Sequence, residues 1–164
     1  SGRVPLSGRA PLMLTHRHTL RVYFEDTDAG GVVYHATYLR YAERARTEAM
    51  RAAGVPHAAL VAAHGLMFMV RRVNLEYLRP ARLDDEIEVL TTPQAMGAAT
   101  INVRQEFRAA GQTLVALDLT LACVRWRDGR PARIPPRWRA ALAPEGGTRG
   151  GMLDREDAGR EGVG

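Results

Sequence analysis

Five segments of the chain alternate apolar and polar residues with the two-residue period of a strand that has one buried face. They lie at residues 19–25, 72–77, 86–89, 100–107 and 115–123. The links between the later segments are short, and two of these links contain Gly97 and Gly111. Because short links join antiparallel neighbours, the pattern predicts an antiparallel sheet.

Another segment has the period of a helix. From Tyr38 to Ala53, apolar residues recur at every third or fourth position, with arginine and glutamate mostly between them. Gly54 and Pro56 end this pattern. The apolar stripe is mostly alanine, which allows another element to approach the helix closely. The order of one strand, one helix and four strands predicts an α+β fold, in which a long helix packs against one antiparallel sheet.

The chain has 164 residues, which is the length of a single domain. The patterned segments place that domain at residues 18–140. We expect a flexible leader over 1–17 and a disordered tail over 141–164, where glycine and charged residues dominate. Such stretches cannot bury enough apolar area to offset the entropy of ordering them.

The composition narrows the class of protein. Hydrophobic residues make up 46% of the chain and charged residues 25%, as in soluble globular proteins. The sequence has no apolar run long enough to span a membrane and no evident secretory signal, so we expect a cytoplasmic protein. Cys123 is the one cysteine, which excludes an internal disulfide and a cysteine-rich metal site. We interpret it as a packing residue of the core.

The positive charge is carried entirely by arginine. All 23 basic residues are arginine, and the net charge is +5. The absence of lysine excludes Schiff-base chemistry and a P-loop. Arginine binds phosphate through its planar fork, so a nucleic acid, a membrane surface or a phosphorylated small molecule would fit this charge. Because no nucleic-acid-binding motif accompanies the arginines, we do not expect a nucleic-acid partner.

The densest cluster of reactive side chains lies at residues 25–35, between the first strand and the helix. Its glycines allow a tight turn, and the helix N-terminus offers unpaired N–H donors that can polarise a carbonyl. A carboxylate there, Asp28, could attack that carbonyl or activate water, and His35 could orient water or move a proton. Asp26 we interpret as a turn residue.

This cluster closely resembles the YbgC-type acyl-CoA thioesterases, a group within the 4-hydroxybenzoyl-CoA thioesterase branch of the hotdog fold that is often linked to the Tol–Pal system. The resemblance begins in the run VYFEDTDAGGVVYH at 22–35 and continues through Tyr38, Tyr41, Glu43, Arg44 and Arg46. A second block, VNLEYLRPARLDD at 73–85, is also similar. The resemblance covers about residues 18–138.

The resemblance implies a hotdog fold, in which five or six antiparallel strands wrap one long central helix. It implies homodimers joined edge to edge, often paired again into homotetramers, with active sites at the dimer interface and no cofactor or metal. The catalytic residues would be Asp28 and His35. The carbonyl-polarising donors would be the backbone N–H groups of Tyr34, His35 and Ala36.

Several residues have a supporting role under this interpretation. Glu43 and Tyr38 would support the catalytic groups, or Glu43 would pair at the surface with Arg40 or Arg46. The phosphates of coenzyme A require basic partners, and the candidates are Arg71, Arg72, Arg125, Arg127 and Arg130. The alternative roles of these arginines are contact with an acyl-carrier protein and simple solvation of a strand face.

The remaining histidines show no metal-ligand spacing. His57 and His64 flank the stretch after Pro56, and we assign them no metal. His16 and His18 lie in the expected leader, where we assign them no function. Ala98 and Ala99 stand where relatives often place hydroxyl residues, so a substrate hydrogen bond would be missing if that turn lined the acyl channel.

The leading hypothesis is therefore hydrolysis of a fatty or aryl acyl-CoA to the free acid and CoA. The sequence leaves open whether Asp28 acts as nucleophile or as general base, and whether the protein touches the inner membrane. The alternative is a non-catalytic hotdog scaffold that binds acyl-carrier protein or enzymes of phospholipid synthesis. The intact pair of Asp28 and His35 favours the enzyme over the scaffold, and it also disfavours a hotdog hydratase.

Overall fold

The computed structural model describes residues 15–144, and the expected leader and tail lie largely outside these residues. Five strands and three α-helices make up the fold, together with one short 3-10 turn. In chain order these are β1 (His16–Arg21), the 3-10 turn (Phe24–Asp26), α1 (Thr37–Ala52), α2 (His57–His64), β2 (Leu66–Tyr77), β3 (Glu86–Met96), β4 (Thr100–Ala109), β5 (Gln112–Arg125) and α3 (Pro136–Leu142).

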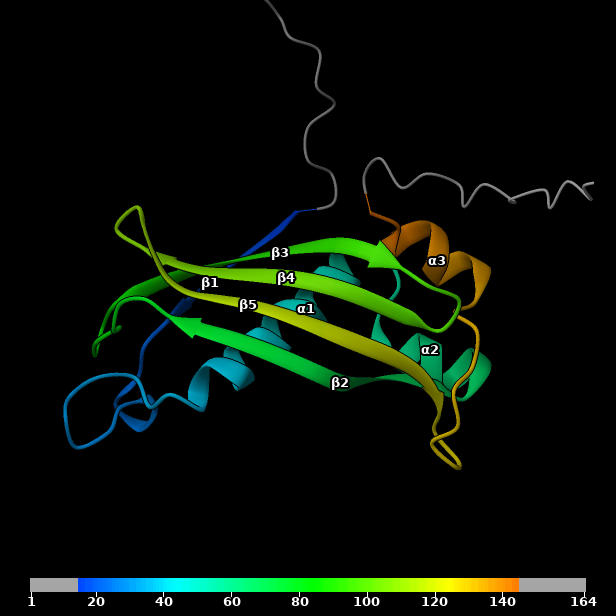
Figure 1. The fold of residues 1–164 in the computed structure, drawn as a ribbon, viewed down its shortest axis with the longest axis horizontal. Coiled ribbons are helices and arrows are strands. Elements are labelled where there is room, and N and C mark those ends of the chain that lie inside the picture. Colours follow the sequence, from blue (N-terminus) through cyan, green and yellow to red (C-terminus); the bar gives the residue numbers. More distant parts are fainter. Residues whose placement is uncertain (1–14, 145–164) are drawn as a thin grey trace, which may run out of the picture.

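The strands form one sheet in the order β1-β3-β4-β5-β2, and every neighbouring pair is antiparallel. Figure 1 shows α1 lying across one face of this sheet, with α2 and α3 together near one end. A tight turn joins β4 to β5, where Ala110 and Gly111 both have positive φ angles, 49° and 75°. The predicted α+β fold is confirmed, as are the antiparallel hairpins.

The alanine stripe of α1 brings the helix close to the sheet. Ala42 and Ala45 are completely buried, and the helix packs mainly on β1 and β3. Tyr38, near the start of α1, meets the buried ring of Phe107 on β4 edge to face, with the ring centres 5.5 Å apart. Burial of these aromatic and aliphatic groups fixes where the helix begins.

The edge strand β2 is left partly uncovered on the same sheet face. Val70, Val73 and Tyr77 on β2 lie opposite Leu121, Leu119 and Val115 on β5, which belong to the core. Residues directly opposite each other share a face, yet the three β2 side chains remain 45%, 37% and 49% exposed. Apolar side chains of the edge strand β2 therefore remain exposed on the face of the sheet that α1 covers elsewhere.

The C-terminal helix closes one end of the fold. Trp138 is buried in α3, and its ring lies 5.3 Å from that of His64. The guanidinium of Arg137 donates to the carbonyl of Gly54, and that of Arg139 donates to the carbonyls at 97 and 98. These bonds satisfy a carbonyl just after α1 and two carbonyls in the turn between β3 and β4.

Three expectations about the elements are wrong in detail. The first strand ends at Arg21 rather than Glu25, and Phe24 is 81% exposed because the chain enters the 3-10 turn. The second strand begins at Leu66, since a β-bulge between Val70 and Arg72 breaks the alternation on which the prediction depended. The helix α3 was not predicted, and regular structure therefore extends from residue 16 to residue 142.

Replacing Phe107 with alanine should lower the free energy of unfolding by about 3–5 kcal/mol, because the change leaves a cavity beneath Tyr38. Urea denaturation measures this loss. Phe24→Ala is the matched control, since the exposed Phe24 side chain should contribute less than about 1 kcal/mol. Equal losses in the two variants would contradict the proposed packing of α1.

Candidate functional site

Asp26 is a buried anchor of the loop between β1 and α1. Its Oδ2 accepts a hydrogen bond from the N–H of Tyr23 at 2.9 Å, and its carbonyl accepts one from the N–H of Tyr34 at 2.9 Å. The interpretation of Asp26 as a turn residue is thereby confirmed. Burial raises the pKa of the Tyr41 phenol, and the neighbouring Asp26 carboxylate raises it further, so Tyr41 keeps its proton beside the loop.

Asp28 lies at the exposed tip of this loop. Its Oδ1 accepts a hydrogen bond from the N–H of Gly30 at 2.8 Å, and its carbonyl accepts one from Gly31 at 3.0 Å. Gly31 has a φ of 76°, and a Cβ added at Gly30 would lie 3.1 Å from Asp28 Oδ1. The two glycines thus provide the backbone conformation and the space that the carboxylate needs. No cation pairs with Asp28 in the described part of the chain.

His35 lies immediately before α1, and Tyr77 holds it there. The hydroxyl of Tyr77 donates to the carbonyl of His35 at 2.9 Å, and the His35 ring packs 4.4 Å from the ring of Tyr34. A cleft of about 240 Å³ opens at this point. Its lining residues are Val33, His35, Tyr38, Tyr77, Leu78, Arg79 and Pro80. Burial raises the pKa of Tyr38, so this wall of the cleft is uncharged.

Two of the three predicted backbone donors are free. The N–H of Tyr34 already donates to the carbonyl of Asp26, so Tyr34 is wrong as a carbonyl-polarising residue. Within residues 15–144, the N–H groups of His35 and Ala36 have no hydrogen-bond acceptor. Both groups lie just before the first turn of α1, which begins at Thr37, and the helix dipole adds positive potential there.

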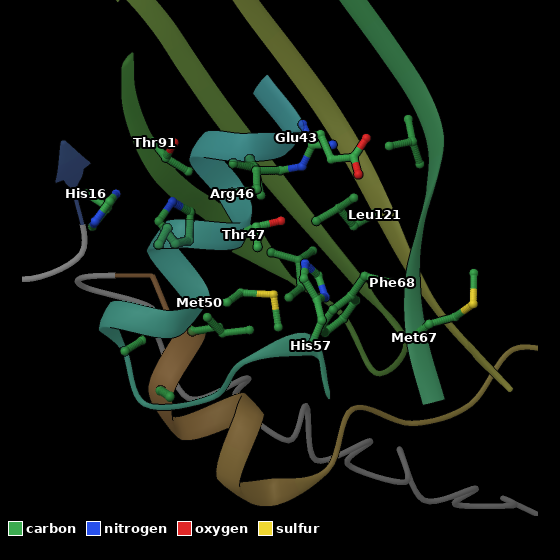
Figure 2. A pocket seen from close by; sticks show the side chains of 18 of the residues that line it. His16, Glu43, Arg46, Thr47, Met50, His57, Met67, Phe68, Thr91 and Leu121 are labelled. Atoms are coloured by element: carbon green, nitrogen blue, oxygen red, sulfur yellow. The ribbon is translucent and has the colours of Figure 1, made fainter. Parts of the chain in front are cut away.

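Glu43 does not reach the cleft around His35. It lies eight residues further along, about 12 Å at the rise of an α-helix, and lines a larger cavity of about 580 Å³. Within residues 15–144, Glu43 forms an ion pair with neither Arg40 nor Arg46. Both expected roles, support of the catalytic groups and pairing at the surface, are therefore wrong. Figure 2 shows the cavity around Glu43, with side chains of α1 on one side and of the strands on the other.

The histidines of the expected leader and of α2 also have places in the fold. His16 lies on β1 and lines the larger cavity together with His57. Because His16 and His18 both lie on β1, their assignment to a flexible leader is wrong. The turn that contains Ala98 and Ala99 lines neither cavity, so the missing hydroxyls remove no contact there.

The arginines proposed for phosphate binding lie away from Asp28. Arg71 and Arg72 are exposed on β2 at the bulge, and Arg125 pairs with Asp128 in the turn after β5. Leu66 lies opposite Arg125, whereas Tyr77 lies opposite Val115. The turn that carries Arg125, Arg127 and Arg130 is therefore at the opposite end of the sheet from His35. Figure 1 shows the turn after β5 and the start of α1 at opposite ends of the sheet.

The comparisons with known proteins agree with this geometry. The model of the thioesterase-like superfamily matches residues 22–142. An acyl-CoA thioester hydrolase YbgC from Escherichia coli is 41% identical over 120 residues, covering 73% of this chain and 89% of the relative. The chain belongs to the YbgC-type acyl-CoA thioesterases. The acyl-CoA thioesterase YbgC of Haemophilus influenzae is 38% identical over 123 residues, which are 75% of this chain and 90% of the relative.

Solved structures place the family member in the hotdog fold. A probable thioesterase from Bartonella henselae has a TM-score of 0.70 and 32% identity, covering 74% of this chain and 99% of that one. A mutant 4-hydroxybenzoyl-CoA thioesterase, complexed with 4-hydroxybenzoyl-CoA, has a TM-score of 0.74 at 18% identity, with 79% and 99% coverage. The second likeness concerns the fold alone. Together they confirm the predicted hotdog architecture.

Two polar residues of the site were missed in the sequence. Tyr77 looked like an ordinary strand residue, and nothing in its spacing indicates its bond to His35. Gln105 stands at an inward position of β4 between Val103 and Phe107, and it is completely buried. A polar residue at an apolar position of an alternating strand was the signal that could have identified it.

No group of three metal-ligating side chains converges anywhere in residues 15–144. In the same residues, every helix is too short or too polar to cross a membrane. Cys123 is completely buried, and burial raises the pKa of its thiol. Its predicted role as a core packing residue is confirmed.

The environment of His57 predicts that the free energy of unfolding depends on pH. Burial lowers the pKa of His57, and the Arg46 guanidinium lowers it further. Below about pH 6.5 the unfolded chain therefore binds more protons at His57 than the folded chain does. Stability should be complete above that pH and should fall as the pH falls towards the lower folded-state pKa.

Replacing His57 with glutamine should reduce this loss of stability at mildly acidic pH. Urea denaturation at about pH 7.5 and about pH 5.5 measures it, on either side of the ordinary histidine pKa. The control is His64→Gln, whose side chain is exposed on α2. If His57→Gln lost as much stability on acidification as the unchanged protein, the neutral state assigned to His57 would be wrong.

Proposed function

We propose that this chain hydrolyses acyl-CoA thioesters to the free acid and CoA, with Asp28 as the reacting carboxylate. The proposal rests on two kinds of group that precede α1, an unpaired carboxylate and unused backbone N–H donors. Asp28 has no cationic partner among the described residues, and the N–H groups of His35 and Ala36 are unused there. A carboxylate and two free amide donors are what acyl transfer requires.

The two amides would bind the thioester carbonyl oxygen and stabilise the negative charge that develops on it. In one route, Asp28 Oδ bonds to the carbonyl carbon, the C–S bond breaks and CoA leaves as thiolate. Water then cleaves the mixed anhydride, releases the acid and restores Asp28, and the surplus proton goes to the thiolate. In the other route, Asp28 takes a proton from water as the water oxygen bonds to the carbonyl carbon; the C–S bond then breaks, and the proton passes from Asp28 to the departing thiolate.

His35 and Tyr77 would keep this arrangement in place. The Tyr77 hydroxyl holds the His35 carbonyl in place. Because the Ala36 N–H belongs to the same peptide group, this bond also fixes the direction of a donor that would face the substrate. The His35 side chain is exposed beside Tyr34, where it can orient water or pass a proton to the departing thiolate.

We also propose a homodimer joined through β2. This edge strand is 12 residues long and leaves apolar side chains uncovered on the helix side, and long exposed edges of this kind are normally paired. In an antiparallel pair of β2 strands, the Leu66 end of one lies beside the Tyr77 end of the other. The turn after β5 of the partner subunit would then lie beside the loop that carries Asp28.

This geometry explains the distant arginines. In such a dimer, the partner subunit's Arg127 and Arg130 would reach the phosphates of a CoA whose thioester lies at Asp28. The turn is held rigid by Asp128, whose carboxylate accepts bonds from Arg125 and from the N–H of Arg130. An acidic acyl-carrier protein would meet the same turn.

The central test is Asp28→Asn with a panel of aliphatic and aryl acyl-CoAs, followed by release of free thiol. We expect the turnover rate to fall by about 100-fold to 10,000-fold, because the amide can neither attack nor accept a proton. The control, Asp118→Asn, lies on the outer face of the sheet in an ion pair with Arg104 and should keep its rate.

If the unchanged protein hydrolyses no thioester, the enzyme proposal fails and the scaffold for acyl-carrier protein or phospholipid-synthesis enzymes takes its place. If Asp28→Asn keeps the full rate, the reaction stands but the site is wrong.

The double variant Arg127→Met and Arg130→Met should raise KM for acyl-CoA by about tenfold, because contacts to phosphate are lost. The same variant should hydrolyse the corresponding acyl-pantetheine, which lacks the nucleotide phosphates, as well as the unchanged protein does. Equal effects on the two substrates would show that these arginines do not recognise the nucleotide.

A further inference from the structure

The larger cavity has apolar walls and a small polar patch. It lies between the C-terminal half of α1, the helices α2 and α3, and the sheet, where all five strands contribute lining residues; Met50, Phe68 and Leu121 are among its apolar lining residues. Its polar lining residues include Arg46, Glu43 and His57 (Figure 2). Apolar walls with a few placed polar groups are typical of small-molecule sites.

Arg46 lines this cavity with N–H donors that the described part of the fold leaves without acceptors. Its Nη1 donates to Oε1 of Gln105 at 3.0 Å, and no carboxylate pairs with it within residues 15–144. A guanidinium has five N–H donors, so most of them remain for a ligand. Burial lowers the pKa of Arg46, which reflects the hydration that this cation has lost.

Gln105 fixes the guanidinium in position. The two hydrogens of its Nε2 are used by the carbonyl of Ala42 at 3.0 Å and by Oγ1 of Thr91 at 2.9 Å. Only Oε1 is left, and it faces Arg46. Because Gln105 is completely buried, its amide cannot turn, and Arg46 is held in place before any ligand arrives.

The larger cavity and the cleft at the proposed catalytic end lie along the same helix, because Glu43 and Arg46 line the first and His35 and Tyr38 line the second. His35, Leu39, Glu43 and Arg46 recur at helical spacing along one side of the chain around α1, and Arg46 lies about 16 Å beyond His35 along the helix. Val73 on β2 stands partly exposed between Tyr77, which bonds to His35, and Val70, which lines the cavity.

We propose that this cavity binds the far end of the acyl group, and that Arg46 selects acyl groups that carry an oxygen there over plain alkyl chains. The inference rests on the proposed function. A hydroxyl, oxo or carboxylate oxygen accepts hydrogen bonds from the unused N–H groups of Arg46. A methyl end displaces water from those donors without replacing it, which a buried polar site disfavours.

The test compares acyl-CoAs of equal length that end in methyl, hydroxyl or carboxylate, over a series from hexanoyl to dodecanoyl. At the matching length, we expect kcat/KM for an oxygen-ended substrate to exceed that of its methyl-ended partner by about tenfold. Arg46→Met should bring the ratio close to one, because the oxygen-ended substrate loses its hydrogen-bond donors and the methyl-ended substrate no longer displaces water from a cation. Arg46→Lys, which keeps a charged donor for Gln105, should give an intermediate ratio.

Arg44→Met is the matched control, since Arg44 is exposed on α1 and lines neither cavity; its ratio should equal that of the unchanged protein. The same substrate pairs, made as non-hydrolysable thioethers, are measured by calorimetry. Selective thioether binding without any hydrolysis would overturn the proposed function and support this inference. Hydrolysis without preference for an oxygen, or a preference that survives Arg46→Met, would overturn the inference and leave the proposed function standing.

Discussion

The close contact between α1 and one half of the sheet determines most of the structure. Ala42 and Ala45 have side chains small enough for the helix to lie directly on β1 and β3. Larger residues there would push the helix away from the sheet, because a packed interior leaves no room for extra atoms. Because α1 packs mainly on β1 and β3, apolar side chains of the edge strand β2 remain partly exposed.

The chemistry depends on where this helix begins. The Tyr38 ring is clamped against Phe107 and Tyr77, and the loop before the helix is tied down by Asp26 on one side and by the Tyr77 hydroxyl on the other. Among residues 15–144, the N–H groups of His35 and Ala36 have no acceptor and Asp28 has no ion-pair partner. The proposed site would therefore use backbone donors, which neighbouring side chains hold in place.

The sequence was a good guide wherever one local period described an element. The alanine period predicted α1, and the alternation around Val103 and around Leu119 predicted β4 and β5. It failed at β2, because the bulge beside Arg71 shifts the alternating face within the strand. The cluster around Asp28 could be located because its loop is local, whereas the bond from Tyr77 to His35 joins residues 42 positions apart and leaves no local pattern.

The exclusive use of arginine has a chemical consequence for a protein that handles activated acyl groups. An acyl thioester can transfer its acyl group to the free amine of a lysine, whose pKa of about 10.4 leaves a small unprotonated fraction at neutral pH. A guanidinium stays protonated and presents no such lone pair. With no lysine among its 23 basic residues, the chain can gather anionic phosphates while offering its own substrate no side-chain amine to modify.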